Sequence, residues 1–186
     1  MTPADVAKAT DGVRWMSLEH GTFFYDLIVK NGFRSILELG TLHGVGTCYL
    51  AAAAEQTGGH VVTVDLPWSA TLKPEAAELL KKCGLRERVS IVRRKDGAEG
   101  FLVSRLDAAF APFNFIYVDA DHTYRPTVLF ATLALASLVP GGYVCFDDIN
   151  NSGYPDVRRA WQVVKQLPGV EITEHGNLGV CRRGSV

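Results

Sequence analysis

Carboxylates end two apolar runs in the second half of this 186-residue chain. Asp119 closes the run 113–119, and the pair Asp147 and Asp148 follows the run that begins at Tyr143. If these runs form neighbouring strands, their backbones lie about 4.8 Å apart. Two unit charges about 4 Å apart repel by about 4 kcal/mol at an effective dielectric of about 20. A divalent cation with oxygen ligands, such as Mg²⁺, would supply the counter-charge that these acids need. The alternative is that Asp119 faces a cofactor while the other two acids cap a loop.

A histidine lies close to the first of these acids. His122 follows Asp119 by three residues, in the turn after the strand, and Asp121 precedes it. A free alcohol is too weakly acidic for imidazole to deprotonate usefully, but a cation on the alcohol oxygen lowers its pKa into the range of histidine. These residue types therefore suit the activation of a hydroxyl group. The alternative is a turn histidine that hydrogen-bonds to backbone or contacts a cofactor.

A glycine-rich corner in the first half of the chain is typical of nucleotide binding. The apolar run 35–39 contains Glu38 and leads into Gly40, Gly44 and Gly46, after which a helix-prone segment begins. Glycines let backbone N–H groups approach a ligand closely, and the N-terminus of a helix offers free donors. The sequence therefore predicts a strand, a turn and a helix that together receive a nucleotide-like ligand.

A second acid supports this interpretation. The next apolar run, 60–65, ends in Asp65, and an acid at that place can hold a ribose diol. A nicotinamide dehydrogenase would carry G-x-G-x-x-G at the first turn. This chain has G-x-x-x-G-x-G, with an acid two residues ahead of the first glycine. The spacing departs from the nicotinamide fingerprint and so argues against a dehydrogenase.

The composition is that of an ordinary globular protein. Hydrophobic residues make up 47% and charged residues 21%, and the formal net charge is -1, so no surface for nucleic acid or anionic membrane is expected. The apolar runs are too short for a membrane span, and the N-terminus lacks the pattern of a signal peptide. The four cysteines form no C-x-x-C pair, so we expect reduced thiols in a cytoplasmic protein and no structural zinc.

Apolar strand candidates alternate with helical stretches, which is typical of an α/β fold with a parallel sheet. An amphipathic helix is expected over Leu18–Lys30, within an N-terminal segment 1–33 that we interpret as a helical cap. A later helix is expected to run from Pro126 to a stop at Pro140–Gly142, and a turn at 175–177 predicts a C-terminal hairpin. The predicted strands are Ser35–Leu39, His60–Asp65, Val89–Arg93, Phe113–Asp119, Tyr143–Asp147, Val170–Glu174 and Leu178–Arg182.

Taken together and in this order, the motifs resemble the class I S-adenosylmethionine-dependent methyltransferases. More closely, the chain is similar to methyltransferase family 24 and to the metal-dependent sugar and catechol O-methyltransferases. Besides the glycine corner and Asp65, the resemblance rests on the segments Asp96–Ala98, Tyr117–Tyr124 and Gly141–Asp148. It implies a Rossmann-like three-layer sandwich, with a mostly parallel seven-stranded sheet that ends in an antiparallel hairpin. We accordingly expect one domain over residues 1–186, with the S-adenosylmethionine-binding core at 34–186.

The resemblance also implies which residues hold S-adenosylmethionine. The glycine corner would pass beneath the methionine part, Asp65 would accept both ribose hydroxyls, and Asp96 would help to frame the adenine. The alternatives are that Asp65 caps the turn that follows it and that Asp96 is a helix N-cap. The full predicted set is Glu38, Gly40, Thr41, Gly44, Gly46, Thr47, Asp65, Leu66, Asp96, Gly97, Ala98 and Asp119.

A metal site and a base follow from the same resemblance. In the related O-methyltransferases, acids that match Asp119 and Asp147 hold a metal, and the position of Asp148 supplies a further ligand. Mg²⁺ or another divalent cation is therefore expected on these three residues. Catechol-type relatives carry Lys at the offset of His122, and relatives that act on macrolide sugars carry His. We predict His122 as the general base, with Asp121 as a reserve base or as the residue that orients it.

These inferences predict an S-adenosylmethionine-dependent methyltransferase that acts on a hydroxyl of a small molecule with the help of a divalent cation. No nucleic-acid or membrane partner is expected. Because the core is short, the acceptor pocket would be formed by the N-terminal segment, by loops or by a partner subunit. A homo-oligomer is therefore one of the alternatives. Two other functions also stay open: a non-catalytic S-adenosylmethionine-binding module of a larger assembly, and a methyltransferase that needs no metal.

Overall fold

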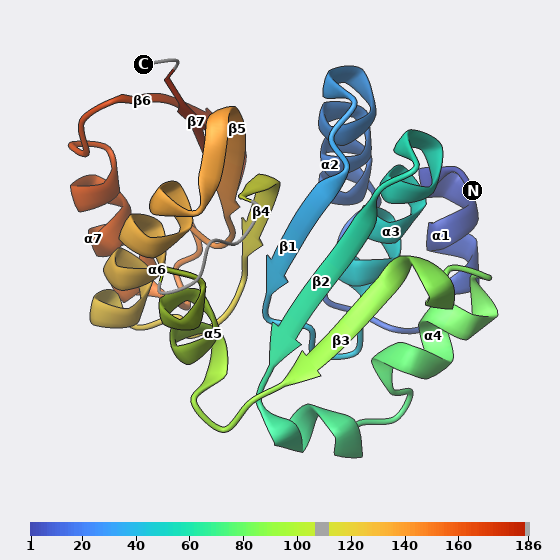
Figure 1. Cartoon of the computed structure of the whole chain (residues 1–186). Coiled ribbons are helices and arrows are strands. Elements are labelled where there is room, and N and C mark those ends of the chain that lie inside the picture. The colour runs from blue at the N-terminus through green and yellow to red at the C-terminus, as the bar shows by residue number, and fades with distance from the viewer. Residues whose placement is uncertain (107–111, 185–186) are drawn as a thin grey trace. The chain divides into compact units, whose positions relative to one another are not determined.

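The computed structural model describes residues 1–106 and 112–184. The chain divides into two compact units, Met1–Lys95 and Asp96–Val186 (Figure 1). The first unit carries the glycine corner predicted from the sequence. The second unit carries the predicted cation site and the C-terminal hairpin.

The first unit is built on parallel strands in the order β3-β2-β1. In their register, Leu39 lies opposite Val64, and Asp65 lies opposite Arg93. The carboxyl ends of the strands are therefore level, which places the glycine corner after β1 beside the acid that ends β2. The elements of this unit are α1 (Pro3–Ala9), α2 (Leu18–Asn31), β1 (Ser35–Leu39), α3 (Val45–Thr57), β2 (His60–Asp65), η1 (Pro67–Thr71), α4 (Ala76–Lys82), η2 (Arg86–Arg88) and β3 (Val89–Arg93).

Local sequence signals set the ends of α2. The Ser17 side chain accepts a hydrogen bond from the His20 backbone N–H at its N-terminus, and Gly32 closes the helix in the left-handed conformation with φ 64°. This matches the helix predicted over Leu18–Lys30. The helix packs against α3, the helix that follows the glycine corner.

The second unit combines parallel and antiparallel pairing. Strand β4 (Phe113–Val118) pairs in parallel with β5 (Leu138–Phe146), and β5 pairs antiparallel with β7 (Leu178–Arg183), which pairs antiparallel with β6 (Val170–His175). Val118 lies opposite Phe146, so the residues that follow these two strands emerge at the same edge. Helices α5 (Gly97–Leu106), α6 (Tyr124–Ala136) and α7 (Pro155–Val164) lie beside these strands (Figure 1).

The start of β5 differs from the prediction. The strand begins before Tyr143, so Pro140–Gly142 lies within it and does not end the preceding helix. The helix ends earlier, at Ala136, and the carbonyl of its C-cap residue Ser137 accepts a hydrogen bond from the Phe113 backbone N–H at 2.8 Å. The chain therefore joins β4 at once, and a register shift between Phe113 and Phe115 accommodates the glycines.

Parallel pairing in both units and the antiparallel C-terminal hairpin confirm the α/β prediction. The N-terminal segment is helical, as expected, and α1 and α2 pack on each other and on α3. Within the described parts of the chain, no helix has the length and apolar character needed to cross a membrane.

The contact between α2 and α3 yields a prediction at Gly21. A Cβ atom at this position would lie 2.5 Å from Cε1 and Cγ of Tyr49, a ring that is buried in the core. Replacing glycine by alanine in a helix normally stabilises it by up to about 1 kcal/mol. Here we expect Gly21→Ala to lower the free energy of unfolding by about 1–3 kcal/mol in urea titrations, because overpacking outweighs helix propensity. Lys30→Ala, on the exposed face of α2, is the control, and a stabilised Gly21→Ala variant would contradict the packing.

Candidate active site

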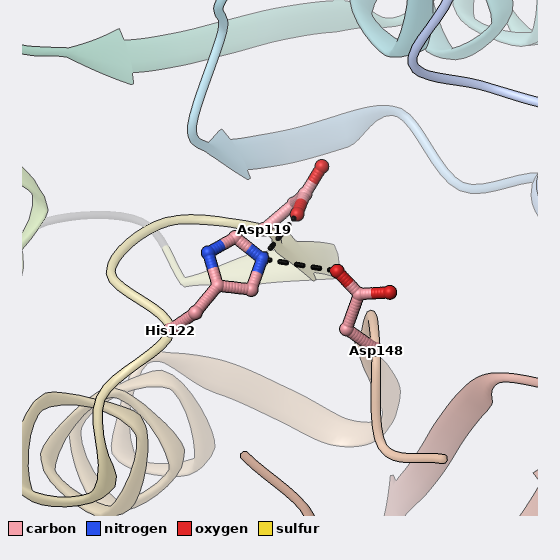
Figure 2. Close-up of side chains that lie close together, drawn as sticks. All are labelled: Asp119, His122 and Asp148. Carbon is pink, nitrogen blue, oxygen red and sulfur yellow. Dashed lines mark ion pairs between the residues drawn. The ribbon is translucent and has the colours of Figure 1, made fainter. Parts of the chain in front are cut away.

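Two carboxylates and an imidazole converge at the carboxyl edge of β4 and β5. Nε2 of His122 lies 3.2 Å from Oδ1 of Asp119 and 3.2 Å from Oδ2 of Asp148 (Figure 2). One ligand atom from each residue lies within 4.8 Å of the others. Asp119 directly follows β4, His122 lies in the loop before α6, and Asp148 lies just beyond β5. The strand register thus brings together residues that are 29 positions apart in the sequence.

The electrostatics of this cluster follow from its crowding. Burial raises the pKa of Asp119 to about 6, and repulsion from Asp147 adds to this effect. Hydrogen bonds to Asp119 and Asp148 raise the pKa of His122 to about 9, against the opposing effect of its burial. Burial alone would raise the pKa of Asp148 too, but hydrogen bonds from His122 and Asn151 outweigh burial and lower it. In the protein alone, the imidazolium is therefore the counter-charge of the two carboxylates.

Tyr154 contacts the face of the His122 imidazole ring. The two rings stack with centroids 4.2 Å apart and an angle of 28° between their planes. Tyr154 directly precedes α7, and its backbone N–H donates to the carbonyl of Asn151 at 3.1 Å. The His122 ring is thus held by a flat aromatic surface and by two carboxylates, which restricts its rotation.

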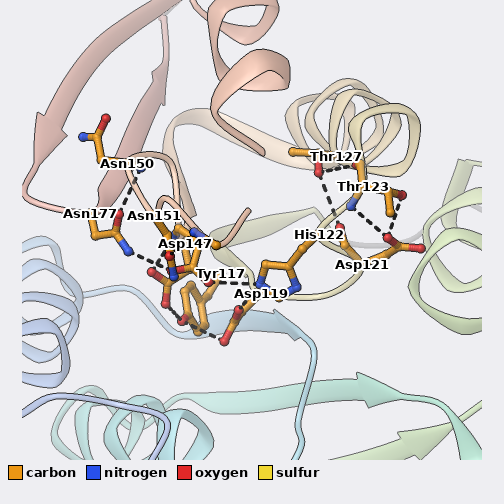
Figure 3. A network of polar contacts seen from close by, with 12 residues as sticks. Tyr117, Asp119, Asp121, His122, Thr123, Thr127, Asp147, Asn150, Asn151 and Asn177 are labelled. Atoms are coloured by element: carbon orange, nitrogen blue, oxygen red, sulfur yellow. Dashed lines mark hydrogen bonds and ion pairs between the residues drawn. The ribbon is translucent and has the colours of Figure 1, made fainter. Parts of the chain in front are cut away.

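Asp147 lies beside the cluster and is linked to it through a phenol. The hydroxyl of Tyr117 lies 2.5 Å from Oδ2 of Asp147 and 3.2 Å from Oδ2 of Asp119 (Figure 3). Oδ1 of Asp147 accepts the backbone N–H of Asp148 at 2.7 Å. Tyr117 is buried near the end of β4 and precedes Asp119, the first residue after the strand, by two positions, so the two side chains project to the same side. All three predicted cation ligands therefore belong to one connected network.

Asp121 takes part in a different contact. Its Oδ1 accepts hydrogen bonds from the backbone N–H of Thr123 at 2.9 Å and from the hydroxyl of Thr123 at 2.7 Å. Thr123 is the N-cap position of α6. In Figure 3 the Asp121 carboxylate points toward this helix start and away from the ring of His122. The structure thus places Asp121 as a residue that shapes the loop.

In the first unit, Asp65 holds the glycine corner. Its Oδ2 accepts backbone N–H groups from Thr41 at 3.0 Å and Leu42 at 2.8 Å, and its Oδ1 accepts the N–H of Leu66 at 2.7 Å. Gly40 has φ 100°, a conformation that favours glycine. A carboxylate has about four acceptor sites. Asp65 therefore retains acceptor capacity for a ligand while it fixes the turn that precedes α3.

Glu38 is buried beneath this corner. Its Oε2 accepts the hydroxyl of Thr63 at 2.6 Å and also the hydroxyl of Thr47. Thr47 lies in the first turn of α3, and Gly44 is the N-cap of this helix with φ 84°. A Cβ on Gly44 would lie 2.7 Å from that of Ala76, so close packing requires glycine here too. Gly46 occupies the first turn of α3 with Thr47.

The segment predicted to frame adenine begins α5 in the second unit. Gly97 has φ 58°, and Ala98 is buried in the first turn of the helix. Gly100 donates its backbone N–H to the carbonyl of Asp96 at 3.0 Å, and a Cβ on Gly100 would overlap the Asp96 carboxylate. Asp96 therefore folds over the start of α5, the position of the N-cap alternative.

Comparison with known proteins places this arrangement in a family. Residues 37–149 match methyltransferase family 24, which is described as a methyltransferase domain. The chain belongs to this methyltransferase family. The matched region includes the glycine corner, Asp65, the Asp119 cluster and Asp147. The predicted enzyme class, an S-adenosylmethionine-dependent methyltransferase, is thereby confirmed.

Named relatives of the methyltransferase include two catechol O-methyltransferases. The protein from Mycobacterium tuberculosis is 26% identical over 178 residues, which cover 88% of this chain and 74% of the relative. The protein from Niastella koreensis is 29% identical over 138 residues, which cover 74% of this chain and 59% of the relative. This methyltransferase therefore spans less than two thirds of the second relative.

Solved structures confirm the fold of the methyltransferase. An O-methyltransferase from Bacillus cereus, solved in complex with SAH, superimposes with a TM-score of 0.73 at 24% identity, over 97% of this chain and 88% of the other. With the strand pairing described above, this likeness confirms the predicted Rossmann-like fold, mostly parallel with a C-terminal antiparallel hairpin.

Tyr117 and Asn177 are among the residues of the network that the sequence did not identify as site residues. Tyr117 appeared only inside a motif, and Asn177 only as part of a hairpin turn. Strand alternation could have found Tyr117, because it shares a face of β4 with Asp119. No local signal could have found Asn177, because it reaches the site through the antiparallel pairing of β5 with β7.

Tyr117 provides a test of the carboxylate network. Tyr117→Phe removes the donor between Asp119 and Asp147, and hydrogen bonds to charged groups contribute about 1.5–3 kcal/mol. We expect the free energy of unfolding to fall by about 2 kcal/mol at pH 7 in the presence of a chelator, measured by urea titration. Tyr25→Phe is the matched control, with an expected change within about 0.5 kcal/mol. Equal effects of the two substitutions would refute the role of Tyr117 as a bridge.

Proposed function

We propose that this methyltransferase transfers the methyl group of S-adenosylmethionine to a hydroxyl of a small molecule, assisted by a divalent cation. The observation that carries the proposal is the convergence of Asp119, His122 and Asp148 at one edge of the second unit. The names of the two catechol O-methyltransferase relatives support oxygen as the acceptor atom and make catechol the first acceptor to test.

The family match contains residues of both compact units, because it extends from position 37 to position 149. We therefore propose that residues 1–186 act as one methyltransferase domain, with 1–33 as a helical cap and 34–186 as the S-adenosylmethionine-binding core. The same core would hold the donor through the residues predicted above. Asp65 accepts three N–H groups, so the acceptor site left on Oδ1 supports a bond to one ribose hydroxyl.

The donor set fits a divalent cation. Asp119, Asp147 and Asp148 would hold it, since carboxylate oxygens are the ligands that Mg²⁺ and Mn²⁺ prefer. The oxygens of Asp119 and Asp148 that face His122 lie within 4.8 Å of each other. When bound, the cation would lower the pKa of an acceptor hydroxyl.

With the cation as the counter-charge of the acids, the pKa of His122 would fall, and the neutral imidazole would take the proton of that hydroxyl at Nε2. As the acceptor oxygen forms its bond to the methyl carbon, the carbon–sulfur bond breaks and S-adenosylhomocysteine leaves. Asp119 and Asp148 lie within 3.2 Å of Nε2 and would stabilise the imidazolium that results. Tyr154, stacked on the ring, would keep Nε2 directed at the reacting oxygen.

His122→Gln tests this assignment. A general base contributes about 10²–10⁴-fold to turnover, so we expect a loss of that size with catechol as acceptor, read out as S-adenosylhomocysteine. Mn²⁺ affinity, measured by calorimetry, should change by less than about 3-fold. If Mn²⁺ affinity falls with turnover, His122 is a ligand and not the base.

Removal of the cation tests the cofactor. We expect wild-type protein in excess EDTA to keep its affinity for S-adenosylmethionine but to lose O-methylation of catechol and of a sugar diol. Full activity in EDTA would support the metal-independent alternative. Donor binding with no turnover of any acceptor hydroxyl, with or without Mg²⁺, would contradict the proposed O-methylation.

A matched pair of variants separates donor binding from turnover. We expect Asp65→Ala to weaken S-adenosylmethionine binding by about 10-fold or more, because it removes a charge-assisted ligand contact and the acceptor that fixes the glycine corner. Asp147→Ala should lower turnover more than donor affinity. Calorimetry and steady-state kinetics on both variants check this, and unaltered donor affinity in Asp65→Ala would refute the ribose assignment.

A further inference from the structure

The hairpin turn between β6 and β7 lies against the loop that carries Asp148. Pairing of Phe146 with Gly179 places the end of β5 beside the start of β7 and so brings this turn to the carboxyl edge. Asn177 and Gly176 of the turn then contact residues 148–150, which lie more than 25 positions earlier in the chain. This turn has no part in the function proposed above.

Four hydrogen bonds join the turn to the loop. Nδ2 of Asn177 donates to Oδ1 of Asp148 at 2.8 Å, and Oδ1 of Asn177 accepts the backbone N–H of Asn150 at 3.0 Å (Figure 3). The carbonyl of Asn177 accepts the N–H of Ile149 at 3.1 Å, and the carbonyl of Gly176 accepts Nδ2 of Asn150 at 2.9 Å. The turn therefore binds both the backbone of the loop and the Asp148 carboxylate.

The two oxygens of Asp148 have different partners. Oδ1 accepts the amides of Asn177 and Asn151, each at 2.8 Å. Oδ2 faces His122 at 3.2 Å. Two amide donors on one oxygen fix the rotation of the carboxylate and leave the other oxygen directed into the cluster.

The backbone of Asp148 also depends on contacts that hold it in place. Its φ of 60° lies in the left-handed region, which costs a non-glycine residue of order 1 kcal/mol or more. A strained conformation persists when the surrounding contacts over-determine it. The hydrogen bonds from the turn supply such contacts at the Asp148 side chain and at the two residues that follow it.

We propose that the Gly176–Asn177 turn positions Asp148 for cation binding, and that Asn177 is the positioning residue. The proposal rests on the proposed function, because it assigns a role to Asn177 only through the cation ligand Asp148. An asparagine suits this place because its amide is both a donor, toward Asp148, and an acceptor, from Asn150.

Direct measurement of Mn²⁺ binding tests the proposal. Substitution of residues that orient metal ligands costs about 10–100-fold in metal affinity. We expect Asn177→Ala to lower Mn²⁺ affinity by about 10-fold or more, measured by calorimetry and by the electron paramagnetic resonance signal of free Mn²⁺. Affinity for S-adenosylmethionine, measured without cation, should stay within about 2-fold of wild type.

Asn150→Ala is the matched control. It removes the bond to the Gly176 carbonyl but leaves both amide donors on Asp148, so its Mn²⁺ affinity should stay within about 3-fold of wild type. Asn177→Ser, with a small side chain that suits turns, is the second variant if Asn177→Ala folds poorly, and it should lose Mn²⁺ affinity in the same way.

The outcomes are distinguishable. Wild-type Mn²⁺ affinity in a folded Asn177 variant overturns the positioning role and leaves the proposed function intact. Equal losses in the Asn177 and Asn150 variants, or a parallel loss of donor affinity and thermal stability, also overturn it, because they indicate a merely structural role. No Mn²⁺ binding by the wild-type protein overturns the cation in the proposed function and the positioning role with it.

Discussion

Crowding of carboxylates at the ends of β4 and β5 is the constraint on which the second unit depends. Asp119 and Asp148 face one imidazole at 3.2 Å each, and Asp147 joins them through the Tyr117 hydroxyl. Acids so close together repel, and partial burial strengthens the repulsion. The arrangement is stable only with positive charge or hydrogen-bond donors among the acids. The imidazolium of His122 fills that need in the protein alone, and a divalent cation would fill it during catalysis.

The same crowding accounts for the way in which the neighbouring strands and helices place side chains around these acids. The level register of β4 and β5 delivers Asp119 and Asp147 to one edge. Tyr117, on the same face of β4 as Asp119, places a donor between two acids. Tyr154 holds the imidazole ring from the start of α7. Each contact comes from a different element, so the cluster is held by the tertiary structure of the unit and not by any single loop.

The buried or partly buried acids of the first unit are stabilised in a different way. Asp65 is satisfied by three backbone N–H groups, and Glu38 by two threonine hydroxyls. Neutral donors stabilise the charges without consuming every acceptor site on Asp65. The two units thus stabilise their acids differently, with backbone amides and threonine hydroxyls in the first and an imidazolium in the second.

The sequence alone determined much of this protein. Strand ends and the glycine corner predicted an α/β fold with a nucleotide-like ligand, because apolar periodicity and glycine spacing are local properties. The order of the motifs gave the family resemblance, which implied the methyl donor and most candidate residues. The early start of β5 was missed, since pairing with β4 overrides the usual meaning of Pro140–Gly142 as a helix stop. Only the tertiary structure decided that His122 lies between Asp119 and Asp148, that Asp121 turns toward α6, and that Asn177 reaches Asp148. These contacts depend on strand register and on backbone conformations such as the φ of Asp148, which no residue type specifies by itself.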